Sequence, residues 1–363
     1  MAQTTIKNRL KKIFDNAPNV DVIFLANLGF YIDPNFSYIT GYTRSVYESN
    51  LLLLTREEAF HITTPLDYGD ALLEKHPEIS VVLASKSGAH LKLLSKLLKG
   101  KRVGINGSFL DYSLYLTLKK HYKPKRIADV TDAFDIARVV KEPEEVEHIR
   151  QAVRITKWAM LQIQRDFKEG VTEREIAAKF EYISQSLGSQ RTVLQPVVCF
   201  GKNSALPHHV PDDTKLKKGD FVLIDACAAV NNYYSDISRT FIFGEGSEQQ
   251  KEMYRIVQEA KIKATRAIKP GANPSKIFKI AKGYIEKAEG GKYKKWVFNH
   301  GLGHSLGLEE HDSHHLSSLD PHVTKPLLAG SVVTVEPGIY IPDFGGVRIE
   351  DDVLITEDGE MIL

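Results

Sequence analysis

Residues 335–351 read VEPGIYIPDFGGVRIED. Two β-rich stretches flank the proline, aspartate and glycine residues of 342–346, a composition typical of a hairpin turn. Glu336 and Glu350 lie in or beside these stretches, so they could face each other across two strands. Taken singly, each is more often an exposed strand residue, with Arg348 as a simple ion-pair partner. The stretch therefore predicts antiparallel strands that carry two candidate carboxylates.

A second candidate hairpin lies upstream, where Asp225 and Asp236 are eleven residues apart. Because strand side chains alternate between faces, a turn at 230–231 or at 231–232 leaves both aspartates on the same face. Two such carboxylates repel each other unless a cation lies between them, and a divalent ion is the usual solution. A surface hairpin with two solvated aspartates is the simpler alternative for this pair alone. Asp225, however, follows an apolar run, 221–224, that is expected to be buried.

Three histidines separated by glycines occur in residues 299–311, which read NHGLGHSLGLEEH. Imidazole is a metal donor, and glycine lets a ligand or another backbone approach closely. The spacing of four and seven residues between His300, His304 and His311 also fits one face of a helix. Each glycine costs about 1 kcal/mol in a helix interior, so the three glycines disfavour a helix here.

Together these segments supply four carboxylates and one imidazole, from Asp225, Asp236, Glu336, Glu350 and His304. Such donors suit hard or borderline divalent ions, and carboxylates and a water can bridge a pair of them. We therefore expect two divalent metal ions per chain, with Mn²⁺ or Co²⁺ favoured and Zn²⁺ as a further option. The two cysteines, Cys199 and Cys227, are too few for a thiolate metal cluster.

The chain is expected to form two domains, 1–138 and 139–363, because single cores seldom grow beyond about 250–300 residues. In the first, apolar runs alternate with amphipathic stretches, which predicts a small α/β domain. In the second, helices are segregated from strand-like runs, which predicts an α+β domain with an antiparallel sheet backed by helices on one face. Its predicted strands are Phe221–Ala229, Tyr233–Phe243, Val332–Val335, Ile339–Ile341 and Val347–Leu354.

Four helix starts are predicted in the second domain, and one of them is at Asn273-Pro274. Pro143 precedes an acidic pair, which suits the first turn and the positive end of the helix dipole. Thr172 with Glu175, and Ser247 with Gln250, have the spacing of a capping box, in which each side chain satisfies a free amide of the other's turn.

Charge and composition exclude several classes of protein. Forty-eight Lys and Arg against 46 Asp and Glu give a formal charge of +2, which argues against a dedicated nucleic-acid surface. Residues 1–10 lack the apolar core of a secretory signal, so we expect none, and no early apolar run is long enough to span a bilayer. With only two cysteines and no disulfide framework, we expect a cytoplasmic protein that does not interact with membranes.

Five motifs resemble those of the pita-bread metallopeptidases in their order and in their residues. This family includes methionine aminopeptidase, aminopeptidase P, prolidase and the metal-free creatinase. The resemblance covers about 143–363, and the motifs are Leu223-Ile224-Asp225, Ser235-Asp236-Ile237-Ser238-Arg239-Thr240, Gly303-His304, Glu336-Pro337-Gly338-Ile339-Tyr340 and Arg348-Ile349-Glu350-Asp351. The run 35–42, NFSYITGY, is similar to part of the creatinase-like N-terminal α/β domain of prolidase, aminopeptidase P and creatinase. Methionine aminopeptidases lack that domain.

The resemblance implies hydrolysis of the bond between an N-terminal residue and proline, by an Xaa-Pro dipeptidase (prolidase). It also implies a homodimer and a small peptide substrate with proline at its second position. Aminopeptidase P, which acts on longer peptides, is the alternative; a creatinase-like amidinohydrolase and a non-enzymatic peptide-binding module are further ones. The residues implied are Glu336, His208 and His311 as catalytic, His300, Tyr340 and Arg348 as substrate-binding, and the five carboxylate and histidine positions as metal ligands.

Three departures from the family pattern occur. Ala226-Cys227-Ala228 follows the first aspartate where glycine is usual, and Ser305 stands where glycine is common; both are expected to adjust packing without removing metal. Residues 311–326 hold no arginine to bind a dipeptide's free carboxylate. Dipeptide preference therefore depends on substitutes, for which the candidates are His311, His314, His315, Lys325 and Arg348.

Overall fold

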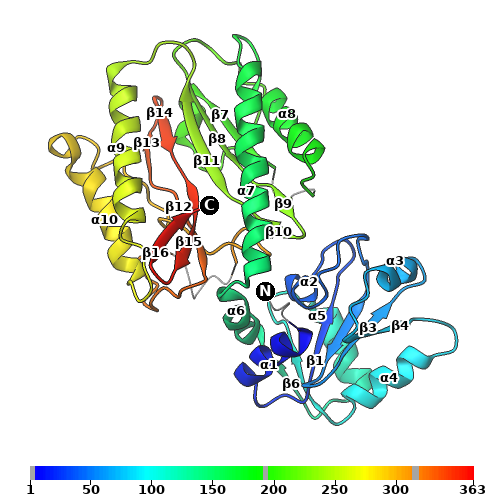
Figure 1. Ribbon diagram of the computed structural model, residues 1–363. Coiled ribbons are helices and arrows are strands. Elements are labelled where there is room, and N and C mark those ends of the chain that lie inside the picture. The colour runs from blue at the N-terminus through cyan, green and yellow to red at the C-terminus, as the bar shows by residue number, and fades with distance from the viewer. Residues whose placement is uncertain (1–4, 191–194, 313–318) are drawn as a thin grey trace. The chain divides into compact units, whose positions relative to one another are not determined.

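The computed structural model describes residues 5–190, 195–312 and 319–363. The chain divides into two compact units, Met1–Arg138 and Val139–Leu363 (Figure 1). Within the described part of the chain, no helix combines the length and apolar character needed to cross a bilayer.

The first unit is built on a six-stranded mixed sheet with the order β4-β3-β2-β1-β5-β6. β1 runs parallel to β5 and β5 to β6, as does β3 to β4, whereas β2 is antiparallel to both of its neighbours. The strands are β1 (Val22–Ala26), β2 (Leu51–Leu54), β3 (Ala59–Thr63), β4 (Ile79–Leu83), β5 (Arg102–Ile105) and β6 (Arg126–Asp129). The helices are α1 (Ile6–Asn16), α2 (Pro34–Thr40), α3 (Tyr68–Leu73), α4 (Ala89–Leu98), α5 (Tyr112–Thr117) and α6 (Thr131–Val139).

The run 35–42 covers all of α2 except Pro34, together with Gly41, at which the helix ends. Asp33 caps the helix by accepting a hydrogen bond from the Asn35 amide, and Pro34 occupies the first turn, where no amide donor is needed. Gly41 ends it in the left-handed conformation, with φ of 67°. Residues 35–40 are all buried. The resemblance in this run therefore lies in a packed helix of the first unit.

The second unit is α+β, and its described strand pairs are antiparallel. This confirms the predicted fold class. The strands are β7 (Val197–Phe200), β8 (Phe221–Ala226), β9 (Ala229–Val230), β10 (Tyr233–Tyr234), β11 (Ile237–Ile242), β12 (Val332–Val335), β13 (Gly338–Ile341), β14 (Gly345–Arg348), β15 (Asp351–Thr356) and β16 (Gly359–Ile362). The helices are α7 (Pro143–Ile163), α8 (Glu173–Ser186), α9 (Glu248–Thr265) and α10 (Pro274–Lys287).

The helices of this unit begin where the sequence predicts. α7 starts at Pro143, and the capping boxes of Thr172 with Glu175 and of Ser247 with Gln250 are both formed. α7 packs on α8 and on β9 to β11, while α9 packs on α10 and on β12 to β14 (Figure 1).

Three predicted strands are interrupted, and the interruptions fall close to the candidate ligands. Asp236 lies outside β10 and β11 because its amide donates to the Asp352 carboxylate, at 3.0 Å. Glu350 lies between β14 and β15 because its amide donates to the carbonyl of Ser238, at 3.1 Å. The sequence predicted one unbroken strand over each of the ranges Phe221–Ala229, Tyr233–Phe243 and Val347–Leu354. That prediction was wrong, because each range is interrupted.

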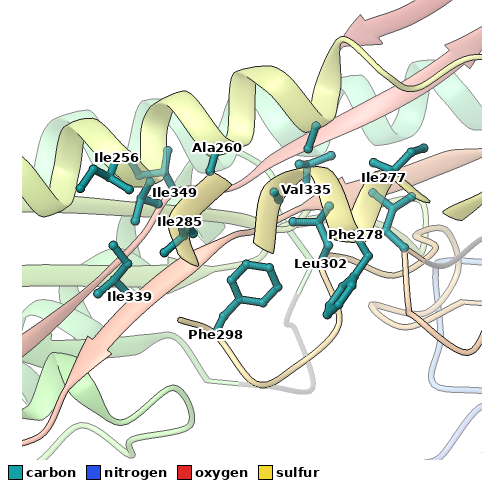
Figure 2. Close-up of a cluster of buried hydrophobic side chains, with 14 of the residues drawn as sticks. Ile256, Ala260, Ile277, Phe278, Ile285, Phe298, Leu302, Val335, Ile339 and Ile349 are labelled. Atoms are coloured by element: carbon teal, nitrogen blue, oxygen red, sulfur yellow. The ribbon is translucent and has the colours of Figure 1, made fainter. Parts of the chain in front are cut away.

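A buried apolar cluster fixes the strands that carry the site. Figure 2 shows Ile256 and Ala260 of α9 with Ile277, Phe278 and Ile285 of α10, packed with Phe298, Leu302, Val335, Ile339 and Ile349. Leu302 and Val335 are both 0% exposed. Leu302 stands two residues before His304, and Val335 stands directly before Glu336, so burial of these two side chains helps to fix both candidate ligands.

Candidate active site

A cavity of about 550 Å³ lies among the strands of the second unit. Nine of the ten predicted site residues line it: His208, Asp225, Asp236, His300, His304, His311, Glu336, Arg348 and Glu350. The tenth, Tyr340, contacts two of these through its hydroxyl, which is 3.1 Å from His300 Nε2 and accepts a hydrogen bond from Arg348 Nη1 at 3.1 Å.

The two aspartates lie on one face of the β8–β11 hairpin. Its turn is Asn231-Asn232, one of the two predicted positions, with φ of 49° and 67°, values that asparagine tolerates better than most residues. Asp225 pairs with Ser238 in the ladder, so Asp236, two residues before Ser238, points to the same face.

The two glutamates face each other across the second hairpin. Val335 pairs with Asp351 in one ladder and Gly338 with Arg348 in the next. In that continuous register, Glu336 stands opposite Glu350, at the point where both ladders are interrupted.

Glu350 carries a buried oxygen without a hydrogen-bond partner among the described residues. Its Oε2 accepts a hydrogen bond from Ser238 Oγ at 2.7 Å, whereas its Oε1 has no partner. A buried acceptor without a donor is costly, which indicates that this oxygen has a ligand of another kind.

His304 is held in an extended segment beside β12, and a helix over 299–311 does not form. The His304 amide donates to Thr334 Oγ1 at 3.1 Å, and the Thr334 amide donates to the His304 carbonyl at 2.9 Å. Gly303 lies so close to this strand that a Cβ there would overlap the main chain of Thr334. A glycine is therefore required directly before the histidine.

The ring of His304 presents a lone pair to two carboxylates. Its Nδ1 is 3.2 Å from the carbonyl of Ser305, which can only accept, so Nδ1 carries the proton. Nε2 is then an acceptor, yet it faces Asp236 Oδ2 at 3.4 Å and Glu336 Oε1 at 3.8 Å, which are acceptors too. These distances exceed a hydrogen bond, and a cation between the atoms would satisfy all three.

Burial perturbs the carboxylates of the site. It raises the pKa of Glu336 to about 7 and raises the pKa values of Asp236 and Glu350 well above the ordinary range. Neighbouring carboxylates raise the pKa values of Asp236 and Glu350 further, whereas His304 and Arg348 partly offset the effect of burial on the pKa of Glu336. A nearby divalent cation has the opposite effect, because it favours the charged form.

The donor set fits divalent metal ions. One donor atom from each of Asp236, His304 and Glu350 lies within 4.8 Å of the others, and all three residues are buried. Carboxylate oxygens with one imidazole suit hard or borderline divalent ions. The partnerless Glu350 oxygen and the lone pair of His304 therefore both fit a metal centre.

Histidines border the centre. His311 stacks on His304 with ring centroids 3.8 Å apart and an interplanar angle of 11°. Burial lowers the pKa of His300 to about 4, so this ring is neutral. Its Nδ1 is 2.6 Å from the Gly301 carbonyl and must be the donor there, which leaves Nε2 to accept from the Tyr340 hydroxyl.

Arg348 is buried and donates hydrogen bonds to several residues of the site. Its Nη2 donates to Asp225 Oδ2 at 2.7 Å, and its Nε donates to Ser238 Oγ at 2.9 Å. Nη2 is also 3.5 Å from the carbonyl of Pro207, the residue before His208. The side chain thus connects both hairpins with the loop that contains Pro207, and it also lines the cavity.

Sequence reasoning missed several residues of this region. Asp320, His322 and Val323 line the cavity from an irregular segment that carries no periodic signal. Asp352, whose pKa burial raises to about 8, could have been found because it lies two residues after Glu350. Of the carboxylate-binding candidates, Lys325 is exposed and does not line the cavity, and His314 and His315 lie outside the described residues.

Comparisons with known proteins show the family of both units. Residues 147–357 match the model of metallopeptidase family M24, and residues 8–140 match the creatinase/prolidase N-terminal domain. The chain is 36% identical to the Xaa-Pro dipeptidase of Pyrococcus horikoshii, over 98% of this chain and 96% of that protein.

Solved structures are similar along nearly the whole chain. The prolidase from Pyrococcus horikoshii OT3 superposes with a TM-score of 0.86 at 34% identity, covering 98% of this chain and 97% of that one. The X-Pro aminopeptidase from Thermotoga maritima MSB8 gives a TM-score of 0.86 at 28% identity, covering 98% and 96%.

Proposed function

Because the chain belongs to metallopeptidase family M24, we propose that it is a metal-dependent Xaa-Pro dipeptidase, which hydrolyses the bond between an N-terminal residue and a following proline. The observation that carries this proposal is the geometry around His304. Its Nε2 lies 3.4 Å from Asp236 Oδ2 and 3.8 Å from Glu336 Oε1, and all three residues line the cavity of about 550 Å³.

The metal centre would be held by five side chains, those of Asp225, Asp236, His304, Glu336 and Glu350. We propose two divalent ions per chain, with Mn²⁺ or Co²⁺ favoured and Zn²⁺ as a further option. When bound, such ions supply Lewis-acid polarisation of the scissile carbonyl and activation of water.

Glu336 is proposed as the acid and base. Its carboxylate takes a proton from the attacking water and returns it to the nitrogen of the leaving proline. Its position supports this role, because one oxygen lies 3.8 Å from His304 Nε2 and the other 3.9 Å from His300 Nδ1.

His208 and His311 are proposed to donate hydrogen bonds to the oxyanion of the tetrahedral intermediate, since both line the cavity. His300, Tyr340 and Arg348 are proposed to bind substrate as a connected group. Their mutual hydrogen bonds fix the ring of His300 and leave it as a rigid wall beside the metal ligands.

The preference for dipeptides over longer peptides is supported by the dipeptidase relative, whereas the similarly close X-Pro aminopeptidase structure supports the alternative, aminopeptidase P. Among the substitutes for the missing arginine, His311 and Arg348 line the cavity, and His322 does so as well. A creatinase-like amidinohydrolase or a non-enzymatic binding module would not need all five ligand positions that this chain retains.

Three finer proposals remain. We propose a homodimer, as the family resemblance implies, which light scattering at assay concentration tests. We propose a cytoplasmic location, supported by Cys199 and Cys227, which are both free thiols. We propose no nucleic-acid or membrane partner, consistent with the near-neutral charge of +2.

A peptide panel tests the proposed function. The metal-loaded protein is assayed side by side with Ala-Pro, Ala-Pro-Ala and Met-Ala-Ser. We expect cleavage of the first two, with Ala-Pro slightly favoured. Preference for Ala-Pro-Ala would move the protein to aminopeptidase P, and release of methionine alone would overturn the proline assignment.

A further inference from the structure

Glu173, a carboxylate with no exposed surface, lies outside the cavity yet organises the loop that enters it. It is the first residue of α8. Its Oε1 accepts hydrogen bonds from the Phe200 amide at 2.7 Å and from Asn203 Nδ2 at 3.0 Å. Its Oε2 is 2.7 Å from His209 Nε2 and accepts from the Asp212 amide at 3.1 Å. All four partners belong to the segment 200–212.

This cluster resembles a metal site in composition but not in hydrogen bonding. Donor atoms of Glu173, His209 and Asp212 lie within 4.8 Å of one another. Each oxygen of Glu173, however, already has two hydrogen-bond partners, so neither has a lone pair to spare. Because a carboxylate accepts only, His209 Nε2 must carry the proton that it shares with Glu173. The contact is a charge-assisted hydrogen bond.

The same loop is held from the other side by the strands of the site. The Gly346 amide donates to Ser204 Oγ at 2.8 Å. The carbonyl of Pro207 is 3.5 Å from Arg348 Nη2. Between these anchors the loop turns tightly, because the His209 amide donates to the Leu206 carbonyl at 3.1 Å.

His208 lies between the two anchors. Its predecessor contacts the buried Arg348, and its successor contacts the buried Glu173. Consecutive Cα atoms are about 3.8 Å apart, so a shift of His209 is passed on to His208. We propose that the Glu173–His209 pair is a positioning device that fixes His208 in the cavity, a proposal that rests on the function proposed above.

The test uses the metal-loaded full chain and three variants. His209→Ala removes one of the four hydrogen-bond partners of Glu173, while His209→Gln places an amide donor at a similar distance. Glu175→Gln is the matched control, because Glu175 lies on the same first turn of α8 and, among the described residues, hydrogen-bonds outside the helix ladder only to Thr172. We expect kcat/KM for Ala-Pro to fall about 10- to 100-fold in His209→Ala, with metal content unchanged, as small displacements of a catalytic group cost rate steeply. His209→Gln should recover most of the loss, and Glu175→Gln should keep wild-type kcat/KM.

A double-mutant cycle separates positioning from general destabilisation. If His209 acts through His208, then His209→Ala should have little further effect on kcat/KM in a His208→Ala background. Full additivity of the two losses, or a wild-type kcat/KM in His209→Ala, would overturn the proposal.

An NMR measurement that does not depend on catalysis distinguishes failure of this proposal from failure of the proposed function. In histidine labelled with ¹³C at Cε1, the His208 resonance is identified by its loss in His208→Ala. It should move or broaden in His209→Ala and stay in place in Glu175→Gln. An unmoved His208 resonance in His209→Ala would contradict the positioning role. Inactivity of the wild type on all three peptides would instead overturn the proposed function.

Discussion

Gly303 packs directly against the main chain of Thr334, so closely that a Cβ at position 303 would overlap the Thr334 carbonyl. The next residue, His304, exchanges hydrogen bonds with the same threonine. The position of the imidazole therefore depends on a glycine that precedes it.

Gly303→Ala should force this segment away from β12, because the main chain of Thr334 cannot rotate aside. We expect a loss of about 1–3 kcal/mol in the free energy of unfolding, together with weaker metal binding, measured by chemical denaturation and by metal titration. Gly301→Ala is the matched control for stability, since a Cβ there meets nothing nearer than 3.6 Å. Equal stability of Gly303→Ala and the wild type would contradict the packing described here.

Glu336→Gln should bind peptide but turn it over poorly. The amide keeps the shape of the side chain but cannot take a proton from water at neutral pH. We expect kcat for Ala-Pro to fall by about 100-fold or more, measured by steady-state kinetics on metal-loaded protein. Near wild-type turnover in this variant would refute the assigned role.

Lys141 and Asp312 form a buried ion pair at 3.3 Å, with each side chain 1% exposed. Lys141→Met removes the cation of this buried ion pair, so we expect a loss of about 3–5 kcal/mol in the free energy of unfolding. Asp312 follows His311, so activity should fall as well. Lys141→Met/Asp312→Asn removes the carboxylate charge as well and should recover part of the stability. A double variant no more stable than the single one would contradict this explanation.

His61 makes the stability of the first unit depend on pH. The ring is 0% exposed, and burial lowers its pKa to about 4. The unfolded chain, with an ordinary pKa near 6.5, binds more protons between these values, so stability is complete above about pH 6.5 and is lost as pH falls towards 4. The loss amounts to about 3 kcal/mol at most.

Denaturant unfolding of the first unit at pH 7 and pH 5 measures this effect. His61→Gln keeps a donor for Asn50 Oδ1, which lies 2.7 Å from His61 Nε2, but does not titrate. Its stability should therefore change less between the two pH values. The same pH dependence in this variant and the wild type would assign the effect to other groups.

Local patterns in the sequence predicted much of the fold. The glycines around His304 correctly disfavoured a helix, and the turn at Asn231-Asn232 is one of the two that keep Asp225 and Asp236 on one face. These features depend on neighbouring residues, so periodicity and turn chemistry reveal them. The opposition of Glu336 and Glu350 follows from hairpin register in the same way.

Contacts distant in sequence could not be predicted in this way. The interruptions at Asp236 and Glu350 arise because their amides bond to Asp352 and Ser238, more than a hundred residues away. Arg348, expected to bind substrate, donates to Asp225 across 123 positions. Local propensities cannot predict such partners, because tertiary packing determines them.

Elemental analysis of the purified or metal-reconstituted chain tests the central claim most directly. The convergence of His304, Asp236, Glu336, Glu350 and Asp225 predicts two divalent ions per chain, and it predicts that Asp236→Ala or His304→Ala loses metal and activity together. Two ions in the wild type, with a clear deficit in these variants, is the expected result. Absence of metal from both the wild type and every reconstituted sample would contradict the account.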